Sequence, residues 1–450
     1  MTDTPGAAPS STFGDYTAGA GRPARPRFAL FSSVTRLLTA VVSFEILFLL
    51  FVFAGHYKEM SELDWFPVDL TAFMFVVSGA AALFLGSMRV NLVSVLKDEG
   101  FILFLLFLLW TAISILWSSF AEFNKLKLLH TATLLSWSFL GCYLFVSRDL
   151  ARTKVFIVGL VVLSVGLIAY WAYYRFVLGL VEEEEGGAFH VATYLTYAYH
   201  AQYLVAVVAA LAIASRRPVS VLLSLLGLLA IWGVMLLIGG RGPLVFSILL
   251  FPLALGIVLV HRHSRRYRFR FLTLPLGLLA VFGLLIVLSS WASPGLFEQL
   301  SEEATTLQRL QGYERSELND SFSGRLHAQQ FALDRWFEAP IFGWGVGEFH
   351  LLYGVWRYPH NLFLEILMEE GVVGFALLLG LAVVAVIRAW RLWPRDRANW
   401  VAMAIVLLFL GELASRATVQ GFLPDERALF AFLGLVLGLG RRFSVQTHPA

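Results

Sequence analysis

The sequence predicts an all-α membrane protein that crosses a bilayer about twelve times, and three observations lead to this prediction. Of the 450 residues, 58% are hydrophobic and 14% are charged, and the mean hydropathy is +0.74. This composition is too apolar for a soluble globular protein. The apolar residues form stretches of roughly 20 residues, the length that one spanning helix needs. Cations gather in alternate connections between these stretches.

Each apolar stretch is expected to form one spanning helix, and the polar connections between stretches are expected to form the loops. The stretches centre on Val42, Val76, Leu109, Leu135, Leu163, Ala206, Leu226, Leu250, Leu279, Leu379, Leu407 and Leu435.

The orientation follows from the positions of the cations. Of the 34 Lys and Arg residues, 22 lie before the first stretch, in alternate loops and in the C-terminal tail. By the positive-inside rule these segments and both termini are cytoplasmic. The opposite loops include an acidic segment over 59–64, four carboxylates over 182–185, and a segment over 291–359 that contains no Lys. These loops are expected to face the periplasm or the cell exterior.

The chain therefore divides into five predicted parts. Residues 1–28, rich in Gly, Pro, Ala and Thr, form a disordered cytoplasmic tail. Residues 29–291 hold helices 1–9, residues 292–359 a periplasmic loop module, residues 360–440 helices 10–12, and residues 441–450 a second tail. The net charge of +3 reflects topology and implies no nucleic-acid partner. The single cysteine, Cys142, lies in an apolar stretch and excludes a disulfide framework.

Two helices are predicted in the loop module. The first covers Leu296 to Leu310, and the second begins at Ser323 as a possible N-cap and ends near Phe337, before Pro340. The following turn has glycines at 343, 345 and 347. Their N–H groups could approach a phosphate; the preferred alternative is a hinge before an interfacial segment anchored by Trp344 and Trp356.

Three polar residues near the predicted outer face are candidates for a site. Arg241 lies between glycines in a short outer turn, where its guanidinium could bind phosphate oxygens in a fork or merely reach lipid head groups. Arg325 lies in a net acidic segment and could equally be an ion-pair partner. His360 precedes a membrane stretch and could be a general base or a helix cap.

The motif around His360 resembles the O-antigen ligase and polymerase superfamily. Pro359, His360 and Asn361 are followed, after nine residues, by Gly371 and Gly374. Upstream of them stand a Ser-Gly-Arg run that ends at Arg325 and a Pro-Ile-Phe-Gly-Trp-Gly run over 340–345. Members are integral-membrane glycan transferases with the glycosyltransferase C-type architecture. The resemblance implies that His360, Arg325 and Arg241 carry the function; here Arg241 follows Gly240, where the family often has Ser.

The resemblance also implies the chemistry. The donor would be a glycan on undecaprenyl pyrophosphate, and the acceptor the sugar of lipid A-core or of a lipid-linked repeat unit. Arg241 and Arg325 would stabilise charge on the leaving pyrophosphate, and His360 would take the proton of the acceptor hydroxyl, with inversion. Asn361 and Arg416 are further candidate substrate contacts, although Arg416 could simply pair with Glu412. No cofactor and no metal are expected; the carboxylates at 64, 69 and 182–185 are interpreted as solvated surface.

Three functions remain open. A ligase would join a finished glycan to lipid A-core, and this is the preferred hypothesis. A polymerase would use another lipid-linked repeat unit of O-antigen or exopolysaccharide as the acceptor. A transporter of lipid-linked glycans should have broken helices and charged residues near the membrane midplane, whereas the polar residues singled out here gather at the predicted outer face.

Overall fold

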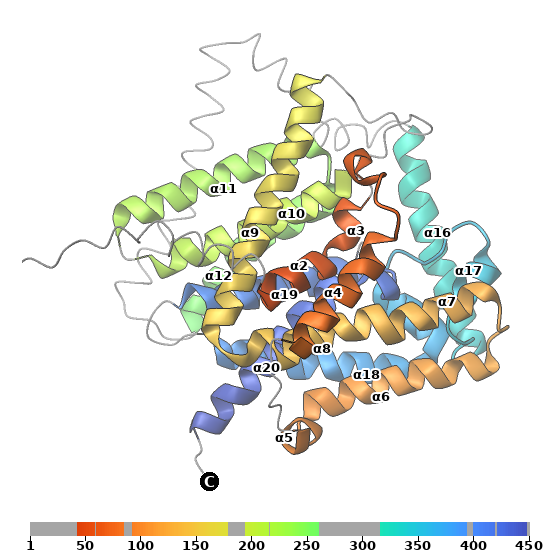
Figure 1. Ribbon diagram of the computed structural model, residues 1–450. Coiled ribbons are helices and arrows are strands. Elements are labelled where there is room, and N and C mark those ends of the chain that lie inside the picture. Colours follow the sequence, from red (N-terminus) through yellow and green to blue (C-terminus); the bar gives the residue numbers. More distant parts are fainter. Residues whose placement is uncertain are drawn as a thin grey trace, which may run out of the picture. The chain divides into compact units, whose positions relative to one another are not determined.

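The computed structural model describes residues 43–58, 60–84, 92–178, 194–215, 217–260, 316–393, 399–418 and 421–447, and every regular element among them is a helix (Figure 1). The α-helices are α2 (Phe44–Val52), α3 (Ala54–Tyr57), α4 (Leu70–Phe84), α5 (Leu92–Leu96), α6 (Glu99–Ser114), α7 (Glu122–His130), α8 (Ser136–Leu144), α9 (Leu150–Ala172), α10 (Tyr194–Ala214), α11 (Pro218–Ile238), α12 (Arg241–Val260), α16 (Ser316–Glu338), α17 (Glu348–Tyr353), α18 (Leu362–Leu392), α19 (Trp400–Thr418) and α20 (Arg427–Thr447).

The predicted all-α membrane fold is confirmed at this level, but the count of twelve spans is not. Six segments of the described chain are long and apolar enough to cross a membrane: 99–117, 122–148, 150–177, 194–214, 218–238 and 362–392. Shorter apolar helices cover 70–83 and 241–254. The predicted centres all fall within helices except Val42 and Leu279, which lie outside the described residues. Twelve spans therefore stay a prediction.

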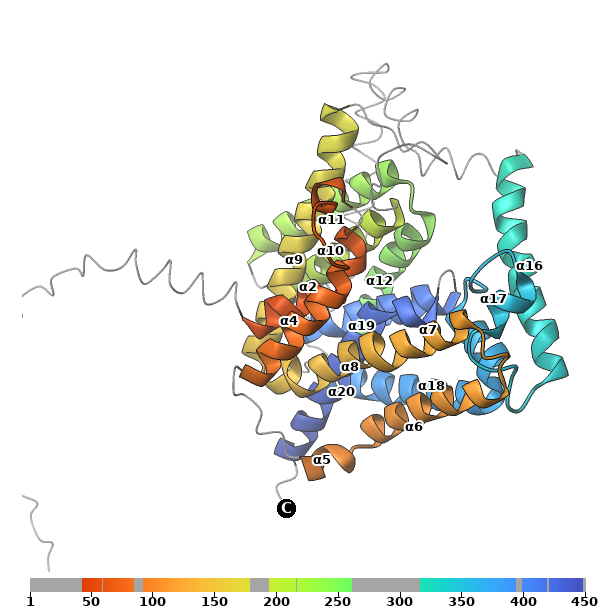
Figure 2. The ribbon, with the colours of Figure 1, turned by 45° about the vertical axis from the view of Figure 1, so that its right-hand side comes forward.

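Small residues allow the closest helix pair to form. Gly434 and Gly438 of α20 are spaced i, i+4 and face α8. A Cβ atom on Gly434 would lie 2.5 Å from the carbonyl oxygen of Phe139, and one on Gly438 2.7 Å from that of Tyr143. Backbones approach this closely in membranes where small residues remove the intervening side chain. The same helix packs on α18, which lies beside α6 (Figure 2).

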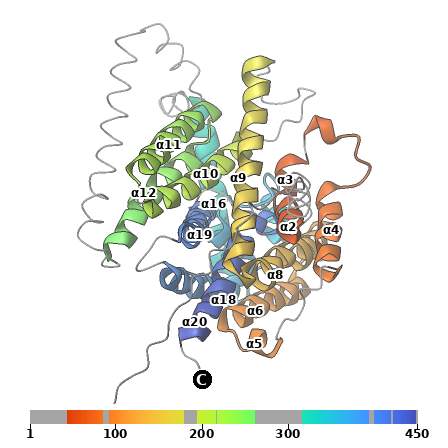
Figure 3. The ribbon, with the colours of Figure 1, turned by 60° about the vertical axis from the view of Figure 1, so that its left-hand side comes forward.

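Helix α10 is the centre of a second group of packed helices. This helix contacts α9, α11, α12 and α19, and α10, α11 and α12 lie together in Figure 3. Tyr197, His200 and Tyr203 are at most 1% exposed, so they pack inside the bundle.

Loops that carry predicted cytoplasmic cations lie at one end of the group formed by α6, α8, α18 and α20. Arg388, at the end of α18, lies 2.8 Å from Asp98 before α6 and donates to the carbonyl oxygen of Leu437 in α20. Arg442 donates to the carbonyl oxygen of Arg148 after α8. The ends of α8, α18 and α20 and the start of α6 thus share one side, as alternating topology requires.

The structure corrects one predicted helix start and leaves other predicted boundaries outside its described part. The second loop helix, α16, begins at Ser316, so Ser323 lies inside the helix and is not its N-cap. Helix α20 continues to Thr447, and the boundary between membrane and cytoplasmic tail at residue 440 stays a prediction. The predicted helix over Leu296 to Leu310 and the tail over 1–28 lie outside the described residues.

Candidate functional site

A broken turn in α18 forms the base of the site. At Gly371 the backbone has φ 66° and ψ −169°, which is not helical. The loop over 340–345 fills this break with its own backbone. Trp344 N donates to Met368 O at 3.0 Å and Gly345 N to Glu369 O at 2.7 Å. In return, Val372 N donates to Pro340 O at 2.9 Å and Val373 N to Ile341 O at 3.4 Å.

This exchange satisfies the groups that the break releases. In an unbroken helix, the N–H groups of residues 372 and 373 would donate to the carbonyl oxygens of residues 368 and 369. Buried backbone groups need partners, and here the loop supplies two donors and two acceptors in their place. The loop and the broken helix therefore form one structural unit.

Glycine is required on both sides of the contact. A Cβ atom on Gly371 would lie 2.2 Å from Ile341 O, and one on Gly343 would lie 2.5 Å from Glu369 O. Both residues also have positive φ, 66° and 71°, a region that residues with a Cβ rarely adopt. The Pro-Ile-Phe-Gly-Trp-Gly run and Gly371 of α18 thus belong to the same contact.

The interpretation of this turn as a phosphate-binding loop is wrong. The N–H groups of Trp344 and Gly345 are used by α18, and Gly347 N donates to the carboxylate of Glu369 at 2.8 Å. The hinge interpretation is also wrong, because the turn is fixed to α18. Trp344 donates through Nε1 to the carbonyl oxygen of Arg335 at 2.7 Å, so its indole N–H is used inside the loop module.

His360 stands immediately before α18 in an unusual backbone conformation. Its φ is 56°, in the left-handed region. The ring lies edge-on to Trp356, with centroids 4.8 Å apart, and 4.4 Å from the ring of Tyr358. Its Nδ1 atom is buried and has no hydrogen-bond partner within the described part of the chain. The next residue, Asn361, caps α18, and its Oδ1 accepts from Leu364 N at 3.1 Å.

The surroundings keep His360 neutral. Burial of the ring, and secondarily the positive charge of Arg325, lower the pKa of His360 from 6.5 to about 4. Arg325 comes from α16, where the neighbouring Gly324 lies against the Trp356 ring; a Cβ atom there would be 2.9 Å from it. A neutral imidazole can accept a proton, so the structure brings together a base and a cation.

Arg416 is held in a buried ionic cluster at the end of α19. Its Nε atom lies 3.0 Å from Glu412 and 3.2 Å from Glu426, and its guanidinium lies 4.2 Å from the Tyr199 ring centroid. The predicted Glu412 pair is thus confirmed. The role of Arg416 as a substrate contact stays a prediction, because two carboxylates already bind its Nε atom.

A short linker between α19 and α20 connects this cluster with His360. Glu426 accepts from Phe422 N at 3.3 Å, and the Phe422 ring stacks on Tyr358 with centroids 5.4 Å apart. Tyr358 in turn packs against His360. The linker is therefore part of the surface against which the His360 ring packs.

Arg241 is the first residue of α12, after Gly239, which has φ 99°. The turn before it packs on α10, since a Cβ atom on Gly240 would lie 2.4 Å from Cβ of Ala198. Tyr199, the next residue of α10, contacts Arg416. The Arg241 turn thus lies at the same end of α10 as the Arg416 cluster. The catalytic roles of Arg241, Arg325 and His360 and the substrate contact of Asn361 stay predictions.

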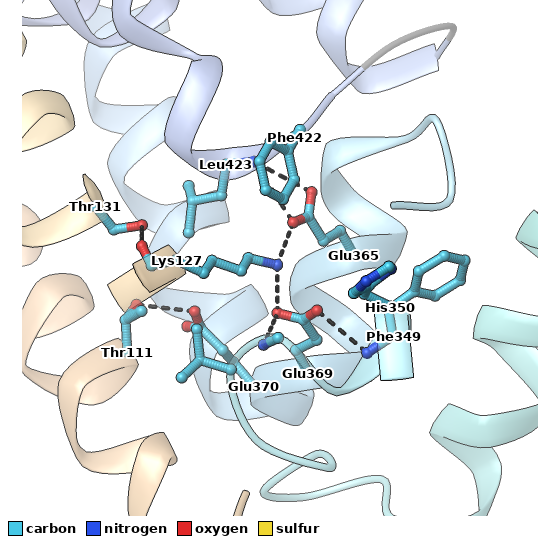
Figure 4. Close-up of polar contacts among 12 residues, drawn as sticks. Thr111, Lys127, Thr131, Phe349, His350, Glu365, Glu369, Glu370, Phe422 and Leu423 are labelled. Atoms are coloured by element: carbon cyan, nitrogen blue, oxygen red, sulfur yellow. Dashed lines mark hydrogen bonds and ion pairs between the residues drawn. The ribbon is translucent and has the colours of Figure 1, made fainter. Parts of the chain in front are cut away.

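Sequence reasoning missed Lys127 and its pairing with carboxylates of α18 (Figure 4). Lys127 of α7 forms ion pairs with Glu365 and, at 2.6 Å, with Glu369 of α18. Glu365 also accepts from Leu423 N at 3.2 Å. A signal was present: one Lys in an apolar stretch and two Glu spaced i, i+4 in another suggest pairing between spans.

The neighbouring carboxylate, Glu370, is not paired with Lys127. It accepts from the hydroxyl of Thr111 at 2.8 Å, and its other oxygen is buried without a hydrogen bond inside the described region. This oxygen lies against Gly374, where a Cβ atom would be 2.6 Å from it. The second glycine of the motif thus makes room for a carboxylate.

Comparison with known families gives a match over this part of the chain. The model of a family described as O-antigen ligase matches residues 226–379. The match runs from the middle of α11 to the middle of α18 and includes Arg241, Arg325, His360 and Gly371. No curated protein matches the chain.

Proposed function

We propose that this chain, whose residues 226–379 match the O-antigen ligase family model, transfers a glycan from undecaprenyl pyrophosphate to an acceptor hydroxyl. The reaction takes place at the periplasmic face of the bacterial inner membrane. The acceptor is lipid A-core, which makes the protein an O-antigen ligase; a lipid-linked repeat unit is the alternative acceptor, and would make it a polymerase.

The observation that carries the proposal is the neutral His360 next to the positive Arg325. In the reaction, the acceptor oxygen attacks the anomeric carbon, and the bond from this carbon to the phosphate oxygen breaks. The electron pair leaves with the pyrophosphate, and the hydroxyl proton passes to His360. The attack comes from the face opposite the leaving group, so the anomeric configuration inverts.

The arginines act on the charge that develops during this step. A guanidinium binds phosphate oxygens in a fork and stabilises the growing negative charge. Arg325 lies close enough to His360 to lower its pKa. An anionic pyrophosphate at Arg325 would offset this charge and make the imidazole more basic when the donor is bound.

No metal takes part in the proposed reaction. Of the acidic residues considered as ligands, Asp69 is exposed, accepts from Ala72 N at 2.9 Å and pairs with Lys58 at 3.3 Å. These contacts support the interpretation of that segment as solvated surface. The carboxylates at 182–185 lie outside the described residues.

Two observations favour a transporter as the second candidate. Helix α18 is broken, and charged residues are buried in candidate spans, features that were used above to distinguish transporters. However, the break is filled by the loop over 340–345, and the Lys127 side chain is 0% exposed. Neither feature lines a path through which a substrate could move, so glycan transfer remains the preferred function.

The product of the purified full-length protein tests the proposal. A purified lipid-linked glycan is supplied with and without lipid A-core, in the presence of a chelator. A single transfer to lipid A-core supports the ligase, whereas a ladder of lengths without core supports the polymerase. Activity that returns only with added Mg²⁺ or Mn²⁺ contradicts the metal-free reaction. Movement of the intact donor across vesicles without any transfer would make the protein a transporter.

A further inference from the structure

The buried cation Lys127 has no role in the reaction described so far. Its side chain and that of Glu365 are 0% exposed, and that of Glu369 is 1% exposed. A substrate cannot touch a fully buried ammonium group. Burying charges is costly and does not by itself stabilise a fold more than apolar packing would. A specific arrangement of the surrounding segments is a better reason for this cluster.

The contacts of the cluster show which segments it joins. Lys127 comes from α7, and both carboxylates come from the first turns of α18. Glu369 also accepts from Gly347 N at 2.8 Å and Phe349 N at 3.4 Å, at the start of α17. Glu365 accepts from Leu423 N in the linker between α19 and α20. One ammonium group therefore connects α7, α17, α18 and the linker (Figure 4).

These segments are the ones that surround His360. The residue itself precedes α18, and the chain from α17 leads directly to it. Phe422, beside Leu423, has its ring 5.2 Å from the Lys127 ammonium and stacks on Tyr358, which contacts the His360 ring. A displacement of the linker or of the first turn of α18 would therefore move the imidazole.

We propose that Lys127 is a positioning residue for glycan transfer: its ammonium group, bound to Glu365 and Glu369, holds the His360 ring in the geometry that the reaction needs. The proposal rests on the proposed function, and it adds a role for a buried cluster on α7 and α18. Misplacement of a reacting group by about 1 Å can cost 10²-fold in rate, so the effect should be seen in kcat.

The test removes the ammonium group without leaving buried charges. Lys127→Met alone would leave two carboxylates facing each other, so it is combined with Glu365→Gln and Glu369→Gln. The amide oxygen at position 365 can still accept from Leu423 N, and the one at position 369 can still accept from Gly347 N; the longer contact of 3.4 Å from Phe349 N to the other oxygen of Glu369 is lost. Lys125→Met is the matched control, because Lys125 lies on the same helix, is half exposed and pairs only with Glu122 at 3.7 Å among the described residues.

Two measurements are made on the full-length protein. Hydrogen exchange of residues 345–361 and 421–426, without substrates, reports whether the cluster holds these segments. Steady-state transfer to lipid A-core, or polymerisation if that is the activity, reports kcat and the donor KM. We expect the triple variant to exchange faster in both segments, with kcat about 10²-fold lower and donor KM nearly unchanged. Lys125→Met should match the parent in both measurements.

Parent-like exchange or parent-like kcat in the folded triple variant would overturn the proposal. If the triple variant does not fold, Glu365→Ala decides, because it retains the Lys127–Glu369 pair and removes the acceptor for Leu423 N. Faster exchange at 421–426 with lower kcat is then expected, and no change in either overturns the proposal. A parent protein without transfer activity would refute the proposed function instead, and unchanged exchange in the variants would still refute the positioning role separately.

Discussion

His360 combines backbone strain with a buried ring nitrogen that lacks a hydrogen bond among the described residues. Its backbone is left-handed, with φ 56°, which costs a residue with a Cβ about 1–2 kcal/mol. Its Nδ1 atom is buried without a hydrogen bond to the described residues. Strain of this kind persists only where the surrounding structure imposes it. Trp356, Tyr358 and the cap at Asn361 are the local groups that impose it.

Replacement of His360 by Asn distinguishes a role as general base from a purely structural role. Asn is among the residues that tolerate left-handed backbone best, so the fold should be retained, but Asn cannot accept a proton at neutral pH. We expect turnover to fall by ~10² to 10⁴, while thermal stability and donor binding remain near those of the parent. His360→Ala should lose turnover similarly. Parent-like turnover of His360→Asn across pH 6 to 9 would assign the proton to another group.

The lowered pKa of His360 predicts the pH dependence. Because that pKa is about 4, the imidazole of the free protein stays neutral well below its usual range. The acid limb of kcat/KM should therefore lie near pH 4, and not near 6.5 as an unperturbed imidazole would give. The acid limb of kcat should lie at a higher pH than that of kcat/KM. The bound pyrophosphate offsets the charge of Arg325 and so raises the pKa of His360. Arg325→Gln should raise the kcat/KM limb but leave it below 6.5, because burial is the larger cause. A kcat/KM limb near 6.5 in the parent would contradict this assignment.

The two arginines should not tolerate replacement by lysine. Lys keeps the charge but loses the planar fork. Arg241→Lys and Arg325→Lys are each expected to lower kcat/KM more than tenfold, equivalent to about 1.4 kcal/mol of transition-state stabilisation. Steady-state kinetics with a purified lipid-linked donor provide the measurement. Parent-like kinetics in both variants would show that only a general positive charge is needed.

Sequence motifs located part of this site, and the limit has a physical cause. His360 and Arg325 follow from local runs of residues, and the structure brings them together. Lys127 was missed because its partners are 238 and 242 residues away in the chain. The glycine-rich turn was misread for a similar reason: its N–H groups are occupied by a distant helix, and no local pattern shows which backbone groups are already satisfied.

At the scale of the element, the interruption at Gly371 determines how α18 packs. The broken turn at Gly371 falls in a backbone region that is essentially restricted to glycine. The helix continues on both sides because the loop over 340–345 replaces the lost hydrogen bonds. The break also directs Glu369 toward Lys127 and leaves Glu370 against Gly374.

Gly371→Ala should therefore destabilise the protein strongly. The added Cβ would lie 2.2 Å from Ile341 O, and the strained backbone adds to the clash, for a loss of about 3 kcal/mol. Thermal unfolding of the purified protein should show a lower Tm. Gly380→Ala is the matched control on the same helix, since its Cβ would be 3.8 Å from Leu103, and it should be neutral or stabilising by up to about 1 kcal/mol. Equal Tm values for both variants would contradict the role of the break.

The helices themselves were largely predictable. The predicted centres that lie in described residues all fall within helices. A long apolar stretch in a membrane forms a helix whatever its detailed sequence. Boundaries were less predictable. Ser323 is a good N-cap residue, yet α16 begins seven residues earlier, at Ser316.

At the scale of the whole molecule, charge distribution predicts the topology. The ion pair of Arg388 with Asp98 and the contact of Arg442 with Arg148 bring predicted cytoplasmic loops to one end. Lys127, by contrast, lies in the candidate span over 122–148, and the cluster around it faces the segments before His360. Lys127 thus has a structural role that differs from the topological role of the cytoplasmic cations.

Labelling of introduced cysteines tests this topology. Cysteines at Ser301, Glu184 and Ser61 should react with an impermeant reagent from the periplasm, and cysteines at Ser264 and Asp396 only after the membrane is opened. The native Cys142 is buried, so the parent should give little background. Labelling of the Ser301 position from the cytoplasm alone would place the loop module, and with it His360, on the wrong side.

The contact between α18 and the loop over 340–345 has a consequence for biogenesis. The loop precedes the helix in the chain, so it leaves the ribosome first and must already be translocated when α18 enters the bilayer. Until the two meet, the broken turn exposes two backbone donors and two acceptors, and each unsatisfied group costs several kcal/mol in hydrocarbon. Integration of α18 should therefore depend on the translocated loop, and a chain in which the loop is deleted should stall at this helix during insertion.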